Sequence, residues 1–301
     1  MSGKGPGAWL SNLFAISLLT LPKALPYSWR IPLIGWVTAR IVAPLTGHER
    51  RALANLALVC PELAPRQARR IARAASNNAG RMIGEMYSRR ALFRRIETLR
   101  MQGPGVEALQ QAHAQGRPII AVSGHFGSYD VIRAVFSRAG HQIGGVYRPM
   151  ANPYINAHYV RHLEAIAQPA FQRDRKGLAQ MLRHLRAGNM IALLTDQREP
   201  DGALLSFFGQ PALTTLSPAE MALKYNALLI PVYGIRLDNG LDFKVVVEEP
   251  IAHSDPRTMM QQINDSLEAR VRAHMGQWLW VHRRWLLPEP DAAGATTAKK
   301  S

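Results

Sequence analysis

From Arg117 onward, short apolar runs alternate with longer runs in which apolar residues recur at helical spacing. The segments "PIIAVS", "QIGGVYR" and "MIALLTD" are typical of strands, whereas "DVIRAVFSRAG" and "RKGLAQMLRHLRAG" are typical of helices that end at a glycine. Such alternation favours an α/β fold, because a helix that follows each strand brings the chain back to start a parallel one. We therefore predict a mixed, mostly parallel central sheet flanked by helices.

Helix starts and one turn mark further elements of this region. "NPYINAHYVRHLEAI" begins with Asn152 as a helix cap, and "SPAEMALKYN" begins with Ser217 in the same role. The strand-like runs "ALLIPVYGIRL" and "FKVVVEEP" are separated by "DNG", which predicts a hairpin and thus an antiparallel pair at one edge of the sheet. A last long helix is expected from about Pro256 to Trp280.

The N-terminal part of the chain holds two apolar stretches, "AWLSNLFAISLLTL" and "IPLIGWVTARIVAPL". Neither reaches the roughly 20 residues that span a bilayer cleanly. We interpret residues 1–48 as a membrane anchor that spans marginally or lies in the interface, with Trp9, Tyr27, Trp29 and Trp36 at headgroup level. A signal peptide and a buried core helix are the alternatives for the first stretch.

The net charge of the chain limits the kinds of molecule that it is expected to attract. The chain has 37 Lys and Arg against 21 Asp and Glu, a formal net charge of +16, which predicts attraction to nucleic acid, anionic lipid or an acidic protein. Many of the arginines lie in a helical region that follows the apolar stretches, where they suit anionic headgroups or a solvated helix face. The single cysteine, Cys60, excludes an internal disulfide framework and fits a reducing compartment.

The segment "AVSGHFGSYD" places His125 just past the end of a predicted strand. Active sites of parallel sheets form at the carboxyl ends of strands. Gly124 and Gly127 permit a tight loop, which we expect to fold Asp130 back toward the imidazole. A carboxylate on one ring nitrogen would orient the imidazole, so that the other nitrogen could take a proton from a substrate hydroxyl. The alternative is purely structural, with His125 at a strand end and Asp130 at a helix cap.

Several segments, taken in order, resemble one family. "SGHFGSYD" resembles the H-x4-D/E block of glycerolipid-type acyltransferases. "VYRPMANPYIN", "RDRKGLAQMLRHLRAGNMIALLTDQ", "FFGQPALTTLSPAEMALKYNALLIPV" and "QWLWVHRRW" resemble further blocks of the late acyltransferases of lipid A biosynthesis, the lauroyl/myristoyl transferase family. The order is the same and the resemblance covers nearly the whole chain. It implies a glycerolipid acyltransferase-like domain over residues 49–290 and leaves a small, polar tail at 291–301, which we expect to be disordered.

The resemblance also implies an activity and a location. A member of this family moves a fatty acyl chain from acyl carrier protein to a hydroxyl of a lipid A precursor, at the cytoplasmic face of the bacterial inner membrane. By match, His125 and Asp130 are the catalytic dyad, and Arg148, Arg161 and Asp196 fall on positions expected to bind substrate. Many members carry glutamate where this chain has Asp130, and the shorter side chain changes reach rather than chemistry.

The residue chemistry is consistent with this assignment. Arginines suit an acceptor with phosphates, and a basic face suits an acidic carrier protein. A thioester has a good leaving group, so the reaction needs no metal or cofactor, and the ten histidines show no metal-ligand spacing. We expect no nucleic-acid partner. Two alternatives remain: a glycerophospholipid or other polar-lipid acyltransferase, and a basic membrane-binding protein without enzymatic activity.

Overall fold

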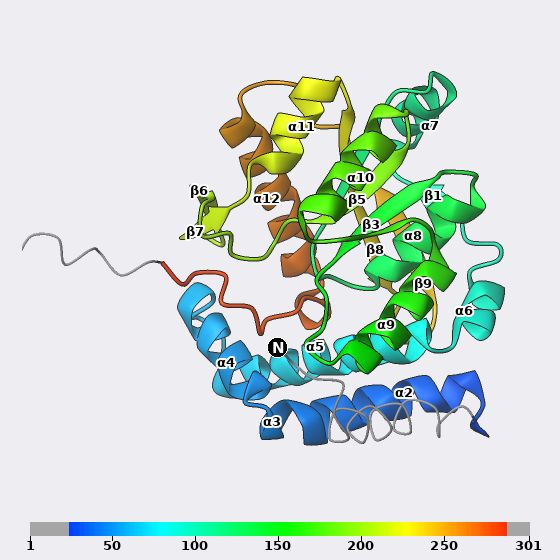
Figure 1. Cartoon of the computed structure of the whole chain (residues 1–301). Helices are drawn as coiled ribbons and strands as arrows, with labels where there is room; N and C mark the ends of the chain where they lie inside the picture. The colour runs from blue at the N-terminus through cyan, green and yellow to red at the C-terminus, as the bar shows by residue number, and fades with distance from the viewer. Residues whose placement is uncertain (1–23, 288–301) are drawn as a thin grey trace, which may run out of the picture.

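The computed structural model describes residues 24–287, so Trp9, the stretch from Ala8 to Leu21 and the predicted tail at 291–301 lie outside the described residues. A seven-stranded sheet runs through the centre in the order β1-β9-β8-β2-β5-β3-β4, with helices on both sides (Figure 1). A two-stranded sheet, β6-β7, lies at its margin. The strands are β1 Met101–Gln102, β2 Ile119–Ser123, β3 Ile143–Tyr147, β4 Ala170–Gln172, β5 Met190–Leu194, β6 Ala203–Phe207, β7 Gln210–Thr214, β8 Leu228–Arg236 and β9 Phe243–Val247.

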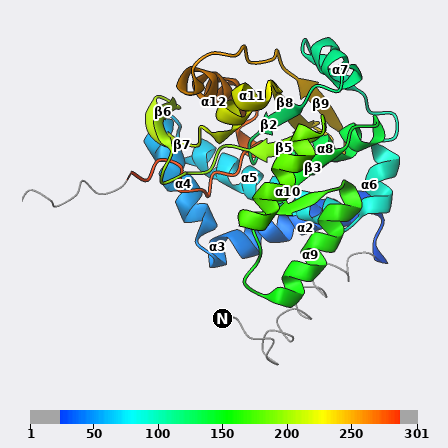
Figure 2. The same ribbon diagram turned by 45° about the horizontal axis from the view of Figure 1, so that its top comes forward.

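The direction of the strands confirms the predicted mixed, mostly parallel sheet. Strands β8, β2, β5, β3 and β4 run parallel, and β2 lies between β8 and β5 (Figure 2). Strand β9 pairs antiparallel with β8 through the predicted hairpin, in which Gly240 takes a positive φ of 72°. The short strand β1, which the sequence patterns did not predict, pairs parallel with β9 at the edge.

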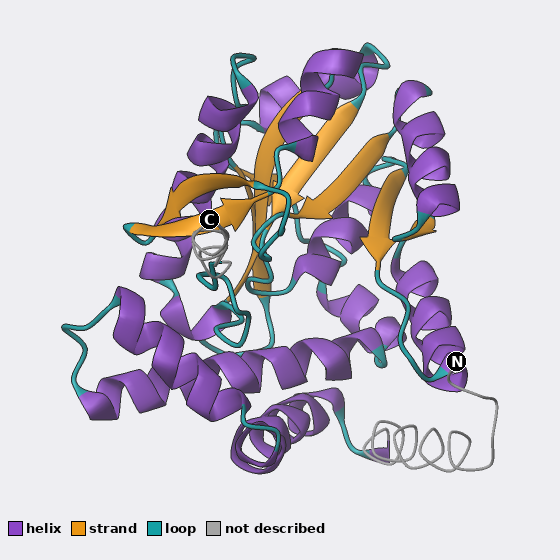
Figure 3. Cartoon of the chain, turned by 60° about the vertical axis from the view of Figure 1, so that its left-hand side comes forward, coloured by secondary structure: helices purple, strands orange, loops and turns teal. Residues whose placement is uncertain are grey.

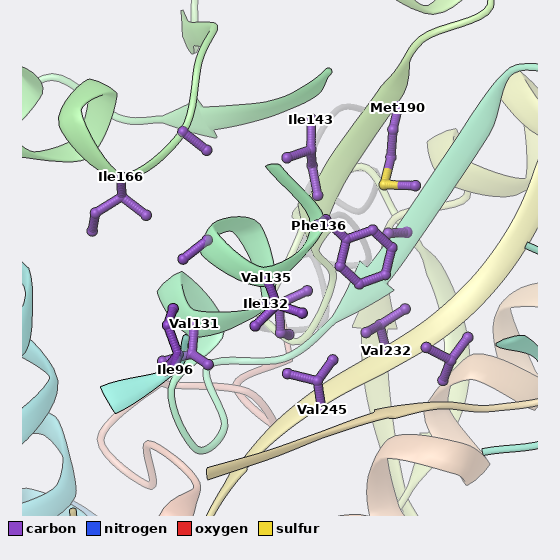
Figure 4. Packing of buried hydrophobic residues seen from close by; sticks show 14 of the residues in the cluster. Ile96, Val131, Ile132, Val135, Phe136, Ile143, Ile166, Met190, Val232 and Val245 are labelled. Carbon is purple, nitrogen blue, oxygen red and sulfur yellow. The ribbon is translucent and has the colours of Figure 1, made fainter. Parts of the chain in front are cut away.

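Both faces of the sheet are buried, and alternate residues of β2 contribute to different cores. Ile119 and Ala121 pack into a cluster with α6 Arg89–Arg95, α7 Val106–Ala114, α8 Tyr129–Arg138 and α9 Pro153–Ile166, part of which is shown in Figure 4. Ile120 and Val122 pack into a second cluster with α10 Arg175–Arg186, α11 Ser217–Tyr225 and α12 Pro256–Ala273. Each buried aliphatic side chain of this kind contributes about 1.5–3 kcal/mol, so the continuous apolar run of β2 follows from cover on both faces.

The N-terminal helices form a layer across one end of the sheet. They are α2 Tyr27–Val37, the π-helical turn η2 Thr38–Val42, α3 Ala43–Leu45, α4 His48–Val59 and α5 Pro65–Met86. Arg236 of β8 links α5 to the sheet, because its guanidinium binds the buried Glu85 carboxylate through two nitrogens. Figure 3 shows several strand arrowheads pointing toward the long helices of this layer. The carboxyl ends of the parallel strands therefore face the N-terminal helices.

The predicted anchor is only partly within the described residues. Trp29 and Trp36 of α2 are 69% and 52% exposed, whereas Tyr27 is half-buried. From residue 24 to residue 287, no helix combines the length and the apolar character needed to cross a bilayer. The membrane-anchoring role of residues 1–48 stays a prediction.

Two local predictions were wrong. Ser217 is the first residue of α11 and does not cap it, because Leu216 takes the cap position. The last helix ends at Ala273 instead of Trp280, followed by a short 3-10 helix, η3 Met275–Gln277. The chain leaves helical geometry there because Trp278 forms a β-bridge with Phe126 and is completely buried.

Candidate active site

The site begins at the carboxyl ends of two neighbouring strands. Ser123 of β2 is paired in register with Leu194 of β5, so the residues that follow them leave the sheet side by side. His125 comes two residues after Ser123, and Asp196 comes two residues after Leu194. The equal offset brings the imidazole and the carboxylate together, although 71 residues separate them in the chain.

His125 and Asp196 are joined by two hydrogen bonds. His125 Nδ1 lies 2.8 Å from Asp196 Oδ1, and the backbone N–H of His125 donates to Asp196 Oδ2 at 2.7 Å. The Asp196 side chain is completely buried, whereas the His125 side chain is 17% exposed. The pair therefore presents only the imidazole to an incoming molecule.

The charge state of Asp196 determines the tautomer of His125. Burial by itself raises the pKa of Asp196, but the charge and the hydrogen bonds of His125 outweigh burial, and the pKa falls well below its ordinary value. An ionised carboxylate only accepts hydrogen bonds, so Nδ1 of His125 must donate. In the neutral imidazole, Nε2 then has a lone pair that can accept a proton.

Two glycines make this approach possible. A Cβ at Gly124 would lie 3.0 Å from Asp196 Oδ2 and 2.8 Å from Leu267, so a side chain there would crowd the carboxylate. Gly127 has a φ of +59°, and a Cβ there would lie 1.9 Å from the carbonyl oxygen of Gly234. The loop that carries His125 can follow this path only with glycine at Gly127.

The C-terminal segment holds the loop and the carboxylate from the other side. Trp278 Nε1 donates to Asp196 Oδ2 at 2.8 Å, and the backbone N–H of Leu279 donates to the carbonyl of His125 at 3.0 Å. Trp278, Trp280 and Trp285 are buried in an aromatic cluster with Phe207 and Phe208. "QWLWVHRRW" is therefore a packed segment that positions the site, and the Phe-Phe pair is part of its core.

Three further side chains surround the imidazole. Gln197 Nε2 lies 3.3 Å from His125 Nε2, where it can donate to the lone pair of that nitrogen. The ring of His282 lies 4.7 Å from the His125 ring, and burial lowers the pKa of His282 to about 4, so this second histidine is neutral near pH 7. The Tyr129 ring meets His125 edge-on at 5.6 Å. Sequence reasoning did not place these three side chains at the site.

Asp130 does not occupy the place expected for it. It is the second residue of α8, and the side chain that this helix start turns toward His125 belongs to Tyr129. Successive helix residues point about 100° apart, which directs Asp130 elsewhere, and its carboxylate lies 3.9 Å from the buried Arg133 guanidinium. Burial raises the pKa of Asp130, and Arg133 opposes that rise. The expectation that Asp130 folds back onto the imidazole is corrected, while its catalytic role stays a prediction.

The two predicted substrate-binding arginines lie on the surface. Arg148 follows the carboxyl end of β3, on the same edge of the sheet as His125, and Arg161 lies in α9, which begins shortly after. Both residues are exposed. Within residues 24–287, no three His, Cys, Asp or Glu side chains gather in a way that could hold a metal ion.

Comparison with known proteins finds relatives that are all described as acyltransferases. The model of a family described as bacterial lipid A biosynthesis acyltransferase matches residues 4–287. A lipid A biosynthesis acyltransferase of Haemophilus influenzae is 24% identical over 91% of this chain and 86% of its own length. Lipid A biosynthesis acyltransferase 2 of Shigella flexneri is 21% identical over 89% of this chain and 87% of its own. A phosphatidylinositol mannoside acyltransferase of Mycobacterium tuberculosis is 21% identical over 60% of this chain and 59% of its own.

Proposed function

Because this chain belongs to the bacterial lipid A biosynthesis acyltransferase family and is an acyltransferase, we propose that it moves a fatty acyl chain from acyl carrier protein to a hydroxyl of a lipid A precursor. The observation that carries the proposed mechanism is the buried Asp196 carboxylate hydrogen-bonded to Nδ1 of a partly exposed His125. The alternative of a basic binding protein without enzymatic activity is set aside, since the family consists of enzymes.

In the proposed reaction, His125 acts as the general base. Its Nε2 takes the proton of the acceptor hydroxyl, and the oxygen attacks the thioester carbonyl of the donor. The Asp196 carboxylate stabilises the imidazolium that forms, as the acid does in a catalytic triad. When the C–S bond breaks, the imidazolium returns the proton to the leaving thiolate. Gln197 donates to the same nitrogen that the acceptor hydroxyl would approach, so we infer that it moves aside or contacts the acceptor.

Charge supports the proposed partners. Acyl carrier protein is acidic and a lipid A precursor bears phosphates, and this chain has a formal net charge of +16. Arg148 is exposed just past the carboxyl end of β3 and Arg161 is exposed on α9, and we propose that both bind the acceptor phosphates. We further propose that the enzyme works at the cytoplasmic face of the bacterial inner membrane, the location that the family resemblance implies; the exposed Trp29 and Trp36 of α2 support contact with a membrane surface.

The mechanism is tested with purified His125→Ala protein. We expect the variant to fold and to lower turnover by about 10²–10⁴-fold, the contribution typical of a general base. Circular dichroism and thermal melting would control for folding. Acyl transfer at the wild-type rate by a folded variant would contradict the mechanism.

The donor is tested by comparing acyl carrier protein with acyl-CoA at low and high salt. Long-range attraction to an acidic carrier is screened over about 8 Å at physiological ionic strength, so kcat/KM with the carrier should fall steeply with salt while kcat changes less. Acyl-CoA offers no protein surface and should be a poorer donor with a shallower salt slope. Equal rates and equal slopes for the two donors would refute carrier recognition.

A second candidate acceptor is a glycosylated phospholipid. It is favoured by the match to the mycobacterial relative whose name specifies phosphatidylinositol mannoside. The two acceptors are distinguished by assaying a phosphorylated lipid A precursor and a phosphatidylinositol mannoside with the same donor. Faster transfer to the second acceptor would replace the first proposal.

A further inference from the structure

A basic hollow lies between the N-terminal helices and the β8–β9 turn, on the α5 side of the loop that carries His125. Its volume is about 390 Å³, and four arginines line it against a single carboxylate, that of Asp238. The arginines come from η2, from α5 and from β8; they are Arg40, Arg73, Arg81 and Arg236. We call this space the Arg40 hollow.

Two of the four arginines have no charged partner. Arg236 is paired with Glu85, and Arg73 lies 3.2 Å from Glu49. Arg81 donates only to neutral oxygens, at 2.6 Å to Asn77 Oδ1 and at 2.9 Å to the Gly240 carbonyl. The Arg40 side chain is exposed and forms no hydrogen bond or ion pair with any residue from 24 to 287.

The incomplete compensation of the Arg81 charge favours an anionic ligand. Burial, and then the charge of Arg236, lower the pKa of Arg81; Glu85 and Tyr27 oppose this shift without cancelling it, so the charged form of Arg81 is destabilised in the hollow. An anion bound between Arg40 and Arg81 would remove that destabilisation. A phosphate group fits the chemistry, because guanidinium groups bind phosphate oxygens through paired N–H donors.

An apolar stripe borders the hollow and identifies the kind of molecule that carries the phosphate. Trp36 lines the hollow and is 52% exposed. Trp29 and Leu33 precede it at helical spacing on the same face of α2, at 69% and 41% exposure, and Leu45 of α3 is 83% exposed. A free anion would need no such stripe, whereas a lipid surface presents phosphates beside apolar chains.

We propose that the Arg40 hollow binds the phosphate of an anionic phospholipid headgroup while the exposed stripe of α2 and α3 enters the bilayer interface. Figure 1 shows these helices together along the lower side of the molecule, with α5 above them. The site is separate from the catalytic pair, and its occupant is a lipid of the surrounding membrane rather than the acyl acceptor.

The hollow adjoins the catalytic loop. Asn78 and Gln277 belong to its lining, and both also hold Gly127, two residues after His125. Asn78 Nδ2 donates to the Gly127 carbonyl at 2.8 Å, and the Gly127 N–H donates to the Gln277 carbonyl at 2.9 Å. A lipid bound in the hollow would therefore hold the loop that carries the imidazole close to the membrane surface, where a lipid acceptor is found.

The first test measures binding of the full chain to phosphatidylcholine vesicles with and without phosphatidylglycerol. Each basic residue near an anionic surface contributes about 1 kcal/mol, or about fivefold in affinity. We expect Arg40→Gln to weaken binding to the anionic vesicles about fivefold and Arg40→Gln/Arg81→Gln about 30-fold. Thermal melting would control for folding of the variants. If the double variant does not fold, Arg40→Gln still decides the test, because the exposed Arg40 side chain has no partner among the described residues whose loss could destabilise the protein.

The matched control removes the same charge from another surface. Lys176 and Arg183 are exposed on α10, which Figure 1 shows in the upper part of the molecule, away from α2 at the bottom. Lys176→Gln/Arg183→Gln should bind the vesicles as the wild type does. Equal weakening in both double variants would mean diffuse attraction and would overturn the proposal, as would no weakening in either.

The second test separates a headgroup site from general surface attraction. Dihexanoyl phosphatidylglycerol, kept below its micelle concentration, is titrated while tryptophan fluorescence is recorded. We expect a saturable change that dihexanoyl phosphatidylcholine does not produce and that Arg40→Gln and Trp36→Phe abolish. An equal response to inorganic phosphate would indicate a free-anion site, and tighter binding of a lipid A precursor would assign the hollow to the acceptor; either result overturns the proposal. Because neither test measures acyl transfer, failure here leaves the proposed function intact.

Discussion

Asp196→Asn tests the assignment of the carboxylate that orients His125. Asp196 accepts three hydrogen bonds: from the backbone N–H and Nδ1 of His125, and from Trp278 Nε1. Two of these bonds go to Oδ2, so the amide oxygen of asparagine would keep them. The amide NH2 would then face Nδ1 as a donor, and Nδ1 would have to accept. The ring proton would move to Nε2, the nitrogen that must take the proton of the acceptor.

The size of the effect follows from this change of tautomer. Loss of a correctly protonated general base costs about 10²–10⁴ in rate, which corresponds to about 3–5 kcal/mol in the activation free energy. The hydrogen bond to a charged carboxylate is lost as well, and bonds of this kind contribute about 1.5–3 kcal/mol to stability. We therefore expect a folded but less stable protein with almost no turnover.

The assay is single-turnover acyl transfer by the purified full chain, with nitrogen NMR of His125 to report the tautomer. Asp130→Asn is the matched comparison, because it makes the same chemical change five residues from His125. We expect Asp130→Asn to lower stability, by leaving the buried Arg133 without its acid, and to retain more turnover than Asp196→Asn. The H-x4-D hypothesis predicts the reverse order. Full activity of Asp196→Asn, or a severe loss in Asp130→Asn at unchanged stability, would refute the assignment of Asp196.

Three further variants probe the surroundings of the pair. Trp278→Phe should lower the free energy of unfolding by about 1.5–3 kcal/mol in chemical denaturation, since it removes one donor to the buried carboxylate; an unchanged midpoint would contradict that bond. Gly127→Ala should destabilise by at least about 3 kcal/mol, because φ is +59° and the new Cβ would overlap the Gly234 carbonyl. The pKa of His282 falls from 6.5 to about 4 on folding, so the stability it contributes is present above pH 6.5 and lost as the pH falls toward 4. His282→Gln should therefore flatten the unfolding free energy over that range by up to about 3 kcal/mol, and an unaltered slope would argue against a buried neutral ring.

Local patterns in the sequence were sufficient to predict most of the elements that build the sheet. The alternation of apolar runs predicted β2, β3, β5, β8 and β9, since each is a short, continuously apolar or β-branched segment between turn residues. Asn152 was correctly predicted to cap α9, and its side chain accepts from the backbone N–H groups of Tyr154 and Ile155. The β6–β7 hairpin, which begins at Ala203, was not predicted, because its strands do not show a clear apolar period and the stability of the hairpin depends on contacts with α12.

The position of His125 could also be read from the sequence, because a histidine directly after a buried strand must lie at the edge of the sheet. Its partner could not be read in the same way. Asp130 is near in sequence but turned away by the geometry of its helix, whereas Asp196 and Trp278 are 71 and 82 residues from the groups they bind. Those contacts depend on the register of β2 against β5 and on the return of the C-terminal segment to the catalytic loop. Local residue patterns determined where the histidine is presented, and only the long-range packing of separate segments decided which carboxylate meets it.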